Sequence, residues 1–171
     1  VVALLDQEHS LRRLLADPAG SPDSKSELVN SLLETKVSPA TLLVVSDVVR
    51  AQWSRPRDLV DAVEQAAVLA TVAEHASARE LEGVEDELFR FGRIVAGQPE
   101  LRAALTTDGA SIEHKRTLVE NLLSGKVSTA TLTLVTEAVT RPRGRTLEQG
   151  LEHFSQLVAE RAKHYIAVVR A

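Results

Sequence analysis

An internal repeat with a shift of 90 residues constrains the fold more than any other feature of the sequence. Residues 21–42 align without gaps with residues 111–132, and 12 of the 22 positions are identical. The strongest match pairs residues 36–42 with 126–132, which share the pattern Lys-Val-Ser-x-Ala-Thr-Leu. The register extends back to residues 11–12 and 101–102. It extends forward, with a four-residue length difference, to the Arg-Pro-Arg sequences at 55–57 and 141–143. Two copies at this period indicate a duplicated domain and not a solenoid array.

The repeat also sets the expected domain boundaries. At the same shift Val1 corresponds to Phe91, so the first copy enters this sequence near the end of its second helix. We expect the missing start to lie upstream, in a longer polypeptide. Residues 1–61 are predicted to be a partial helical copy, residues 62–165 a complete helical bundle, and residues 166–171 the start of a further C-terminal domain. The β-prone run at 165–169 predicts a first strand of that domain, and the alternative is a longer final helix.

Helix-start and helix-end signals are dense along the chain. Ser-Pro pairs at 21–22 and 38–39 are typical of an N-cap followed by a first-turn proline, and Ser111 and Ser128 stand at the matching positions of the second copy. Thr146 and Gln149 fit a capping box, and Gly97 and Gly125 suit a left-handed helix end. Aromatic residues make up only 3% of the chain, which disfavours an all-β fold. We predict an all-α protein with helices at about 1–16, 22–34, 39–53, 57–76, 79–96, 99–106, 112–124, 129–140 and 147–165.

Apolar spacing supports these helices. In the segment 79–96, apolar residues recur at intervals of three and four and form one helix face: Leu81, Val84, Leu88, Phe91 and Val95. The predicted linkers are short, so neighbouring helices are expected to pack antiparallel.

Composition and motifs argue against catalysis. The chain has no cysteine, which excludes disulfide frameworks and thiol nucleophiles. Its five histidines form no HExxH pair, phosphate-binding glycine motifs are missing, and the consecutive acids at 85–87 point to different helix faces. We therefore predict a protein that is not an enzyme and has no metal or cofactor. No signal peptide is recognisable, and no apolar run approaches the roughly 18 residues of a membrane span.

Arginine-rich loops leave an alternative open. Residues 141–145 carry three arginines, and Arg50, Arg55 and Arg57 accompany the first copy. Such side chains can contact phosphate, which would suit a helical nucleic-acid-binding regulator. The net charge of -4 and the scarcity of aromatic residues favour solvated loops instead. A helical scaffold without a specified partner is a third alternative.

Two predicted helices are more apolar than one buried face requires. Around residues 66–73, apolar residues cover most of the helix circumference. In the helix 129–140, Leu132, Val135 and Val139 are expected to point inward, while Leu134 lies on another face. Such a helix is either central in the bundle or covered by a partner helix. The small alanines would leave a shallow groove that admits an amphipathic helix.

Several stretches in the second copy resemble one known family. They are Val84-Glu85-Asp86-Glu87-Leu88-Phe89-Arg90-Phe91-Gly92-Arg93-Ile94-Val95, Gln98-Pro99-Glu100-Leu101-Arg102, Lys115, and Gly125-Lys126-Val127-Ser128. Their order and spacing are similar to those of the delta subunit of F-type ATP synthase, also called the oligomycin-sensitivity-conferring protein. The resemblance covers residues 62–171. The extra upstream copy resembles the actinobacterial, mycobacterial-type arrangement in which a b-like stalk segment is fused to delta.

The resemblance implies a fold, partners and a site. It implies a six-helix domain that binds N-terminal helices of the alpha subunit in a groove made by its first and fifth helices, here about 62–76 and 129–140. It also implies a non-catalytic stator protein that joins the catalytic head to the b-type stalk. Such a protein would lie on the cytoplasmic side of the plasma membrane and meet the membrane only through the complex. The partner-binding residues expected from this mapping are Ala66, Leu69, Ala70, Ala73, Leu134 and Ala138.

Overall fold

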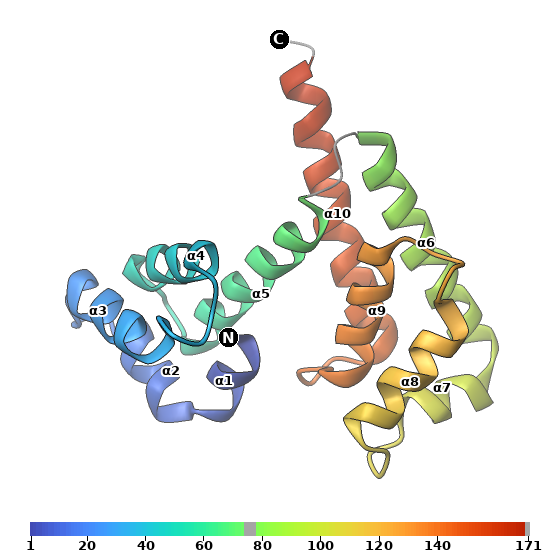
Figure 1. Cartoon of the computed structure of the whole chain (residues 1–171), viewed down its shortest axis with the longest axis horizontal. Coiled ribbons are helices and arrows are strands. Elements are labelled where there is room, and N and C mark those ends of the chain that lie inside the picture. Colours follow the sequence, from blue (N-terminus) through green and yellow to red (C-terminus); the bar gives the residue numbers. More distant parts are fainter. Residues whose placement is uncertain (74–77, 170–171) are drawn as a thin grey trace. The chain divides into compact units, whose positions relative to one another are not determined.

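The computed structural model describes residues 1–73 and 78–169, and all regular elements within these ranges are α-helices (Figure 1). The all-α prediction is therefore confirmed. The chain divides into two compact units, Val1–Ala67 (unit 1) and Val68–Ala171 (unit 2). The division falls inside one helix, α5 (Pro56–Val72), a little beyond the boundary predicted after residue 61.

Unit 1 contains the helices of the first copy. They are α1 (Val2–Gln7), α2 (His9–Ala16), α3 (Pro22–Leu33), α4 (Pro39–Arg50) and most of α5. Helices α3 and α4 lie side by side. Trp53 packs against the core of this unit, and its indole Nε1 donates a hydrogen bond to the carbonyl oxygen of Val48 at 3.0 Å. The buried core residues are Leu5, Leu15, Ala16, Val29, Leu33, Val45, Val49, Leu59, Val60 and Val63.

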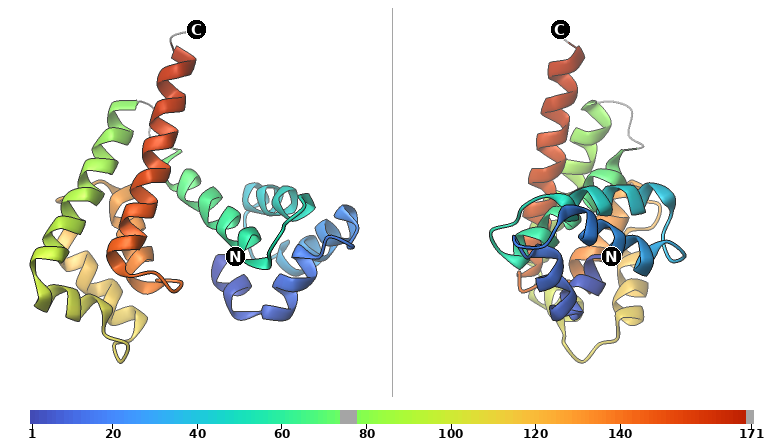
Figure 2. Two further views of the ribbon diagram at one scale, coloured as in Figure 1. Left: turned by 180° about the vertical axis from the view of Figure 1, so that it is seen from behind. Right: turned by 90° about the vertical axis from the view of Figure 1, so that its left-hand side faces the viewer.

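Unit 2 contains the end of α5 and five further helices. They are α6 (Ala78–Gly97), α7 (Pro99–Thr106), α8 (Ile112–Leu123), α9 (Thr129–Thr140) and α10 (Leu147–Val169). The two long helices α6 and α10 run antiparallel and side by side, which Figures 1 and 2 both show. The predicted apolar stripe of α6 is confirmed, because all five of its residues are buried in the core of unit 2: Leu81, Val84, Leu88, Phe91 and Val95.

The helix boundaries confirm the repeat. Shifting α2, α3 and α4 by 90 residues gives the bounds of α7, α8 and α9, and α1 corresponds to the last six residues of α6. The four predicted serine N-caps all form, since each serine Oγ accepts a hydrogen bond at 3.2 Å from the backbone N–H three residues on: Ser21, Ser38, Ser111 and Ser128.

The helix predicted over 1–16 is in fact two helices. The chain leaves the helical conformation at Glu8, where φ is -91° and ψ is 78°. Its repeat counterpart is Gln98, which separates α6 from α7 with φ -129° and ψ 89°. Gly125 has the predicted positive φ (+72°), but the same prediction for Gly97 is wrong, because that residue is the last of α6 and has no positive φ.

The C-terminal strand prediction is also wrong, and its alternative, a longer final helix, is confirmed. Helix α10 continues to Val169. The β-propensity of residues 165–169 is a weak preference, and the continuation of α10 overrides it. The predicted capping box at its start is present: the backbone N–H of Thr146 donates to Gln149 Oε1 at 2.9 Å, and that of Gln149 donates to Thr146 Oγ1 at 3.2 Å. Residues 74–76 of the helix predicted over 57–76 lie outside the described residues.

Candidate partner-binding site

The α5 part of the predicted site lies at the protein surface. Ala70 and Ala73 are exposed, and Leu69 is half-buried. Val68 and Val72, on the same helix, are 3% and 1% exposed and belong to the core of unit 2. The end of α5 thus presents one apolar face to its own unit and a face of small apolar side chains to solvent. Ala66, one turn earlier and within unit 1, is half-buried.

The α9 part of the predicted site is not at the surface. Leu134 is 3% exposed and Ala138 is 5% exposed, and both belong to the core of unit 2. Helix α9 packs against α6, α8 and α10, so three helices surround it. Gly150 of α10 approaches Ala138 so closely that a Cβ placed on it would lie 3.6 Å from the Ala138 Cβ. The two residues are therefore covered by the protein's own helices.

The prediction of which α9 residues point into the core is therefore corrected as well. Val135 and Val139 are buried as predicted, but Leu134 is buried with them, and Leu132 is only partly buried. A helix that is apolar on all sides is typically central in its bundle. For α9 this alternative holds, and an open groove between α5 and α9 lined by Leu134 and Ala138 is absent from the described part of unit 2.

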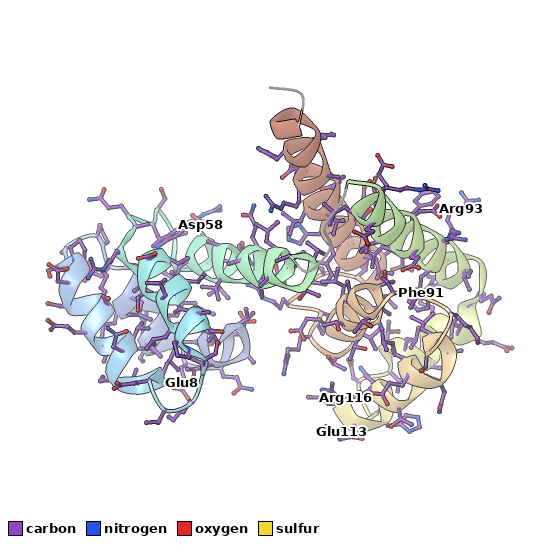
Figure 3. All side chains as sticks on the ribbon, turned by 45° about the horizontal axis from the view of Figure 1, so that its top comes forward. Glu8, Asp58, Phe91, Arg93, Glu113 and Arg116 are labelled. Atoms are coloured by element: carbon purple, nitrogen blue, oxygen red, sulfur yellow. The ribbon has the colours of Figure 1, made fainter. Side chains whose placement is uncertain are left out.

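Sequence reasoning missed the exposed apolar residues of α6. Phe89 is 62% exposed and Ile94 is 49% exposed. Their signal was available, because they are large apolar residues that fall outside the buried stripe. Ile94 lines a depression of about 390 Å³ together with Leu101 and Leu122. Arg93, which is labelled in Figure 3, lies on the same helix and lines a second depression together with Glu148 and Glu152 of α10.

A partly buried acidic contact joins α6 to the start of α9. Glu87 Oε2 accepts hydrogen bonds from the backbone N–H of Ser128 at 3.0 Å, from Ser128 Oγ at 2.9 Å, and from Thr131 Oγ1. Partial burial raises the pKa of Glu87, but these hydrogen bonds and the positive charge of Arg90 outweigh it, so the pKa lies below its ordinary value of 4.5. A carboxylate at a helix N-terminus is also favoured by the helix dipole.

The arginine-rich segments are largely paired with carboxylates. Arg141 contacts Glu137 at 2.7 Å, and Arg50 contacts Asp23 at 3.1 Å. Arg55 contacts Asp58 at 2.9 Å, and hydrogen bonding to Asp58 raises the pKa of its guanidinium. Arginines that already bind neighbouring carboxylates offer little to a phosphate backbone, so the structure gives the nucleic-acid alternative no support.

Within residues 1–73 and 78–169, no three metal-ligating side chains gather in one place. His75 lies outside these residues. None of the helices described combines the length and the apolarity that crossing a bilayer requires. The described residues define an all-helical protein built from a duplicated unit.

The comparison with protein families is specific. The family model of the ATP synthase delta (OSCP) subunit matches residues 65–171, which is more than half of the chain. The chain belongs to the ATP synthase delta (OSCP) subunit family. The resemblance seen in the sequence is thereby confirmed, whereas the fusion to a b-like stalk segment stays a prediction.

Individual relatives agree with this assignment. The chain is 99% identical over 171 residues to the ATP synthase subunit delta of Thermobifida fusca, a match that covers 100% of this chain and 64% of that protein. It is 50% identical over 169 residues to the subunit delta of Streptomyces griseus, covering 99% of this chain and 62% of that protein. It is 40% identical over 171 residues to that of Beutenbergia cavernae, covering 100% and 63%. The chain thus spans less than two thirds of the length of these curated relatives.

Proposed function

We propose that this chain is a non-catalytic part of the stator of an F-type ATP synthase. It connects the catalytic head to the b-type peripheral stalk, so that rotor torque drives ATP synthesis and does not turn the head. The complex lies in the plasma membrane, and the chain lies on its cytoplasmic side. The observation that carries this proposal is the family match over residues 65–171.

The partner on the head is an N-terminal helix of the alpha subunit. The exposed small residues at the end of α5, Ala70 and Ala73 beside the half-buried Leu69, suit close approach of an amphipathic helix. Because Leu134 and Ala138 are buried in the core of unit 2, they do not touch the partner. Ala66 belongs to the same helix and completes the proposed contact.

One such contact is too weak to hold the head alone. Burying about four Leu-sized side chains contributes roughly 6–12 kcal/mol, at about 1.5–3 kcal/mol each. Association costs about 4–15 kcal/mol in lost freedom. A durable attachment therefore needs several contacts acting together, and the b-type stalk supplies the others.

The test is binding of a peptide with the alpha-subunit N-terminal sequence of Thermobifida fusca, measured by calorimetry. Ala70→Glu places a carboxylate in the proposed contact, where losing its water without a partner is costly. We expect the Kd to rise about tenfold or more, equivalent to about 1.4 kcal/mol. The circular dichroism spectrum and the unfolding midpoint should stay unchanged, because Ala70 is exposed.

Two further substitutions make the result decisive. Ala103→Glu is the matched control, since Ala103 is an exposed alanine on α7 outside the proposed contact, and peptide binding should survive it. Leu134→Glu should unfold unit 2, because it buries an unpaired charge in the core. Equal affinity of the Ala70→Glu and Ala103→Glu variants would remove α5 from the contact. Failure of the unsubstituted chain to bind the peptide would remove the alpha subunit as its partner.

A further inference from the structure

Equivalent positions in the two copies differ in burial on one helix face. In α9, Ala130 and Thr131 are 3% and 0% exposed, and Leu134 is buried next to them. Their counterparts in α4 are Ala40, Thr41 and Val44. All three are exposed, Val44 at 45%. These positions follow the i, i+1, i+4 spacing of a single face, which we call the bare face of α4 (Ala40, Thr41 and Val44).

In unit 2 the corresponding face is covered by α6. The hydrogen bonds from Ser128 and Thr131 to Glu87 place this face of α9 against the middle of α6. The first copy keeps the hydroxyl donors of this arrangement: Ser38 Oγ and Thr41 Oγ1 lie 3.0 Å apart, as their counterparts lie 2.8 Å apart. Among the described residues of unit 1, no carboxylate accepts a hydrogen bond from Ser38 or Thr41.

The repeat fixes where the covering helix belongs. Helix α1 corresponds to the last six residues of α6, and Leu5 is buried as its counterpart Val95 is. The rest of α6, which includes Glu87, corresponds to positions before Val1. The matched relative from Thermobifida fusca is longer than this chain, which covers 64% of it.

We propose that the bare face of α4 is the docking site of a helix supplied by the polypeptide upstream of Val1, continuous with α1. This helix covers Ala40 and Val44, the counterparts of the buried Ala130 and Leu134. It carries a carboxylate four residues before Val1, at the position of Glu87, which accepts hydrogen bonds from Ser38 and Thr41. Apolar residues stand three and seven residues before Val1, at the positions of Leu88 and Val84.

Cysteine reactivity tests this docking because the chain contains no cysteine. Ala40→Cys is introduced into residues 1–171, into a chain extended upstream with the relative's natural sequence, and into a chain extended only downstream. Any cysteine of the extensions is replaced by serine. We expect the thiol to react with a disulfide reagent at least about tenfold more slowly in the upstream-extended chain than in the other two, since docking leaves it accessible only on local opening.

Matched variants control for unrelated effects. Leu43→Cys should react rapidly in all three chains, because Leu43 is 64% exposed and its counterpart Thr133 is exposed as well. Ala130→Cys should react slowly in all three. Val44→Cys repeats the measurement in case Ala40→Cys does not fold. Equal reactivity of the Ala40 thiol in all chains, protection by the downstream extension alone, or protection that grows with protein concentration and so reports a second copy, would each overturn the proposal.

Discussion

At the scale of single residues, Glu87 connects two helices of unit 2 through hydrogen bonds. Its Oε2 atom receives three hydrogen bonds from the first turn of α9, although the side chain comes from α6. Hydrogen bonds to a charged group stabilise a fold by about 1.5–3 kcal/mol each, more than those between neutral groups. A single carboxylate therefore fixes the start of α9 relative to α6.

The lowered pKa of Glu87 predicts a pH dependence of stability. Its carboxylate stabilises the folded state fully above the unfolded-state pKa of about 4.5, and this contribution is lost as the pH falls through the lower folded-state pKa. Glu87→Gln should therefore cost about 1 kcal/mol at pH 7, after allowance for partial exposure. The difference between the two proteins should shrink below pH 4.5. Urea unfolding of both proteins from pH 7 to pH 3 checks this, and a difference that stays constant with pH would contradict it.

At the scale of helices, the two copies provide matched pairs of caps. Ser38 and Ser128 each accept one backbone hydrogen bond at 3.2 Å from the third residue of their helix. Only Ser128 also donates from its hydroxyl to a carboxylate, at 2.9 Å. The same residue at the same helix position therefore has different surroundings in the two units.

This difference predicts unequal costs for the same substitution. Ser38→Ala should destabilise α4 by about 0.5–2 kcal/mol, the usual cost of losing an N-cap. Ser128→Ala should destabilise α9 by about 1 kcal/mol more, because a hydrogen bond to a partly exposed charged group is lost as well. Amide hydrogen exchange of the first turn of each helix measures both effects. Equal protection losses in α4 and α9 would show that the hydrogen bond from Ser128 Oγ to Glu87 contributes nothing to stability.

Helix positions were largely predictable from the sequence, because caps and apolar spacing act locally. The break at Glu8 was missed because neither glycine nor proline marks it. The repeat nevertheless pairs it with Gln98, where Gly97 and Pro99 do mark a break. The site was less predictable. Whether Leu134 faces a partner or the protein's own core depends on how α9 packs against α6 and α10, which the local sequence pattern of α9 does not encode.

At the scale of the whole molecule, the described residues form two hydrophobic cores that share no residue. Leu15 in the first core and Leu105 in the second are repeat counterparts, and they are 1% and 0% exposed. The chain's single tryptophan, Trp53, packs only against the first core. Its fluorescence therefore reports on unit 1, while circular dichroism reports on the helices of both units.

Truncating each leucine should affect the two signals differently. Leu15→Ala should cost about 2–5 kcal/mol and move the Trp53 unfolding transition to lower denaturant concentration. Leu105→Ala should cost a similar amount in the circular dichroism transition and leave the Trp53 transition in place. If both substitutions moved the Trp53 transition equally, the two units would unfold as one cooperative body.

The residues of the bare face of α4 that are identical in both copies have an evolutionary consequence. Changes at solvent-facing positions usually alter stability by less than about 0.5 kcal/mol, so selection tolerates them and duplicated sequences diverge there first. Yet Ala40 and Thr41 still match Ala130 and Thr131, although only the second pair is enclosed. These two residues have stayed identical although one of the two faces is exposed, as expected of positions under the same restraint in both halves of the duplication.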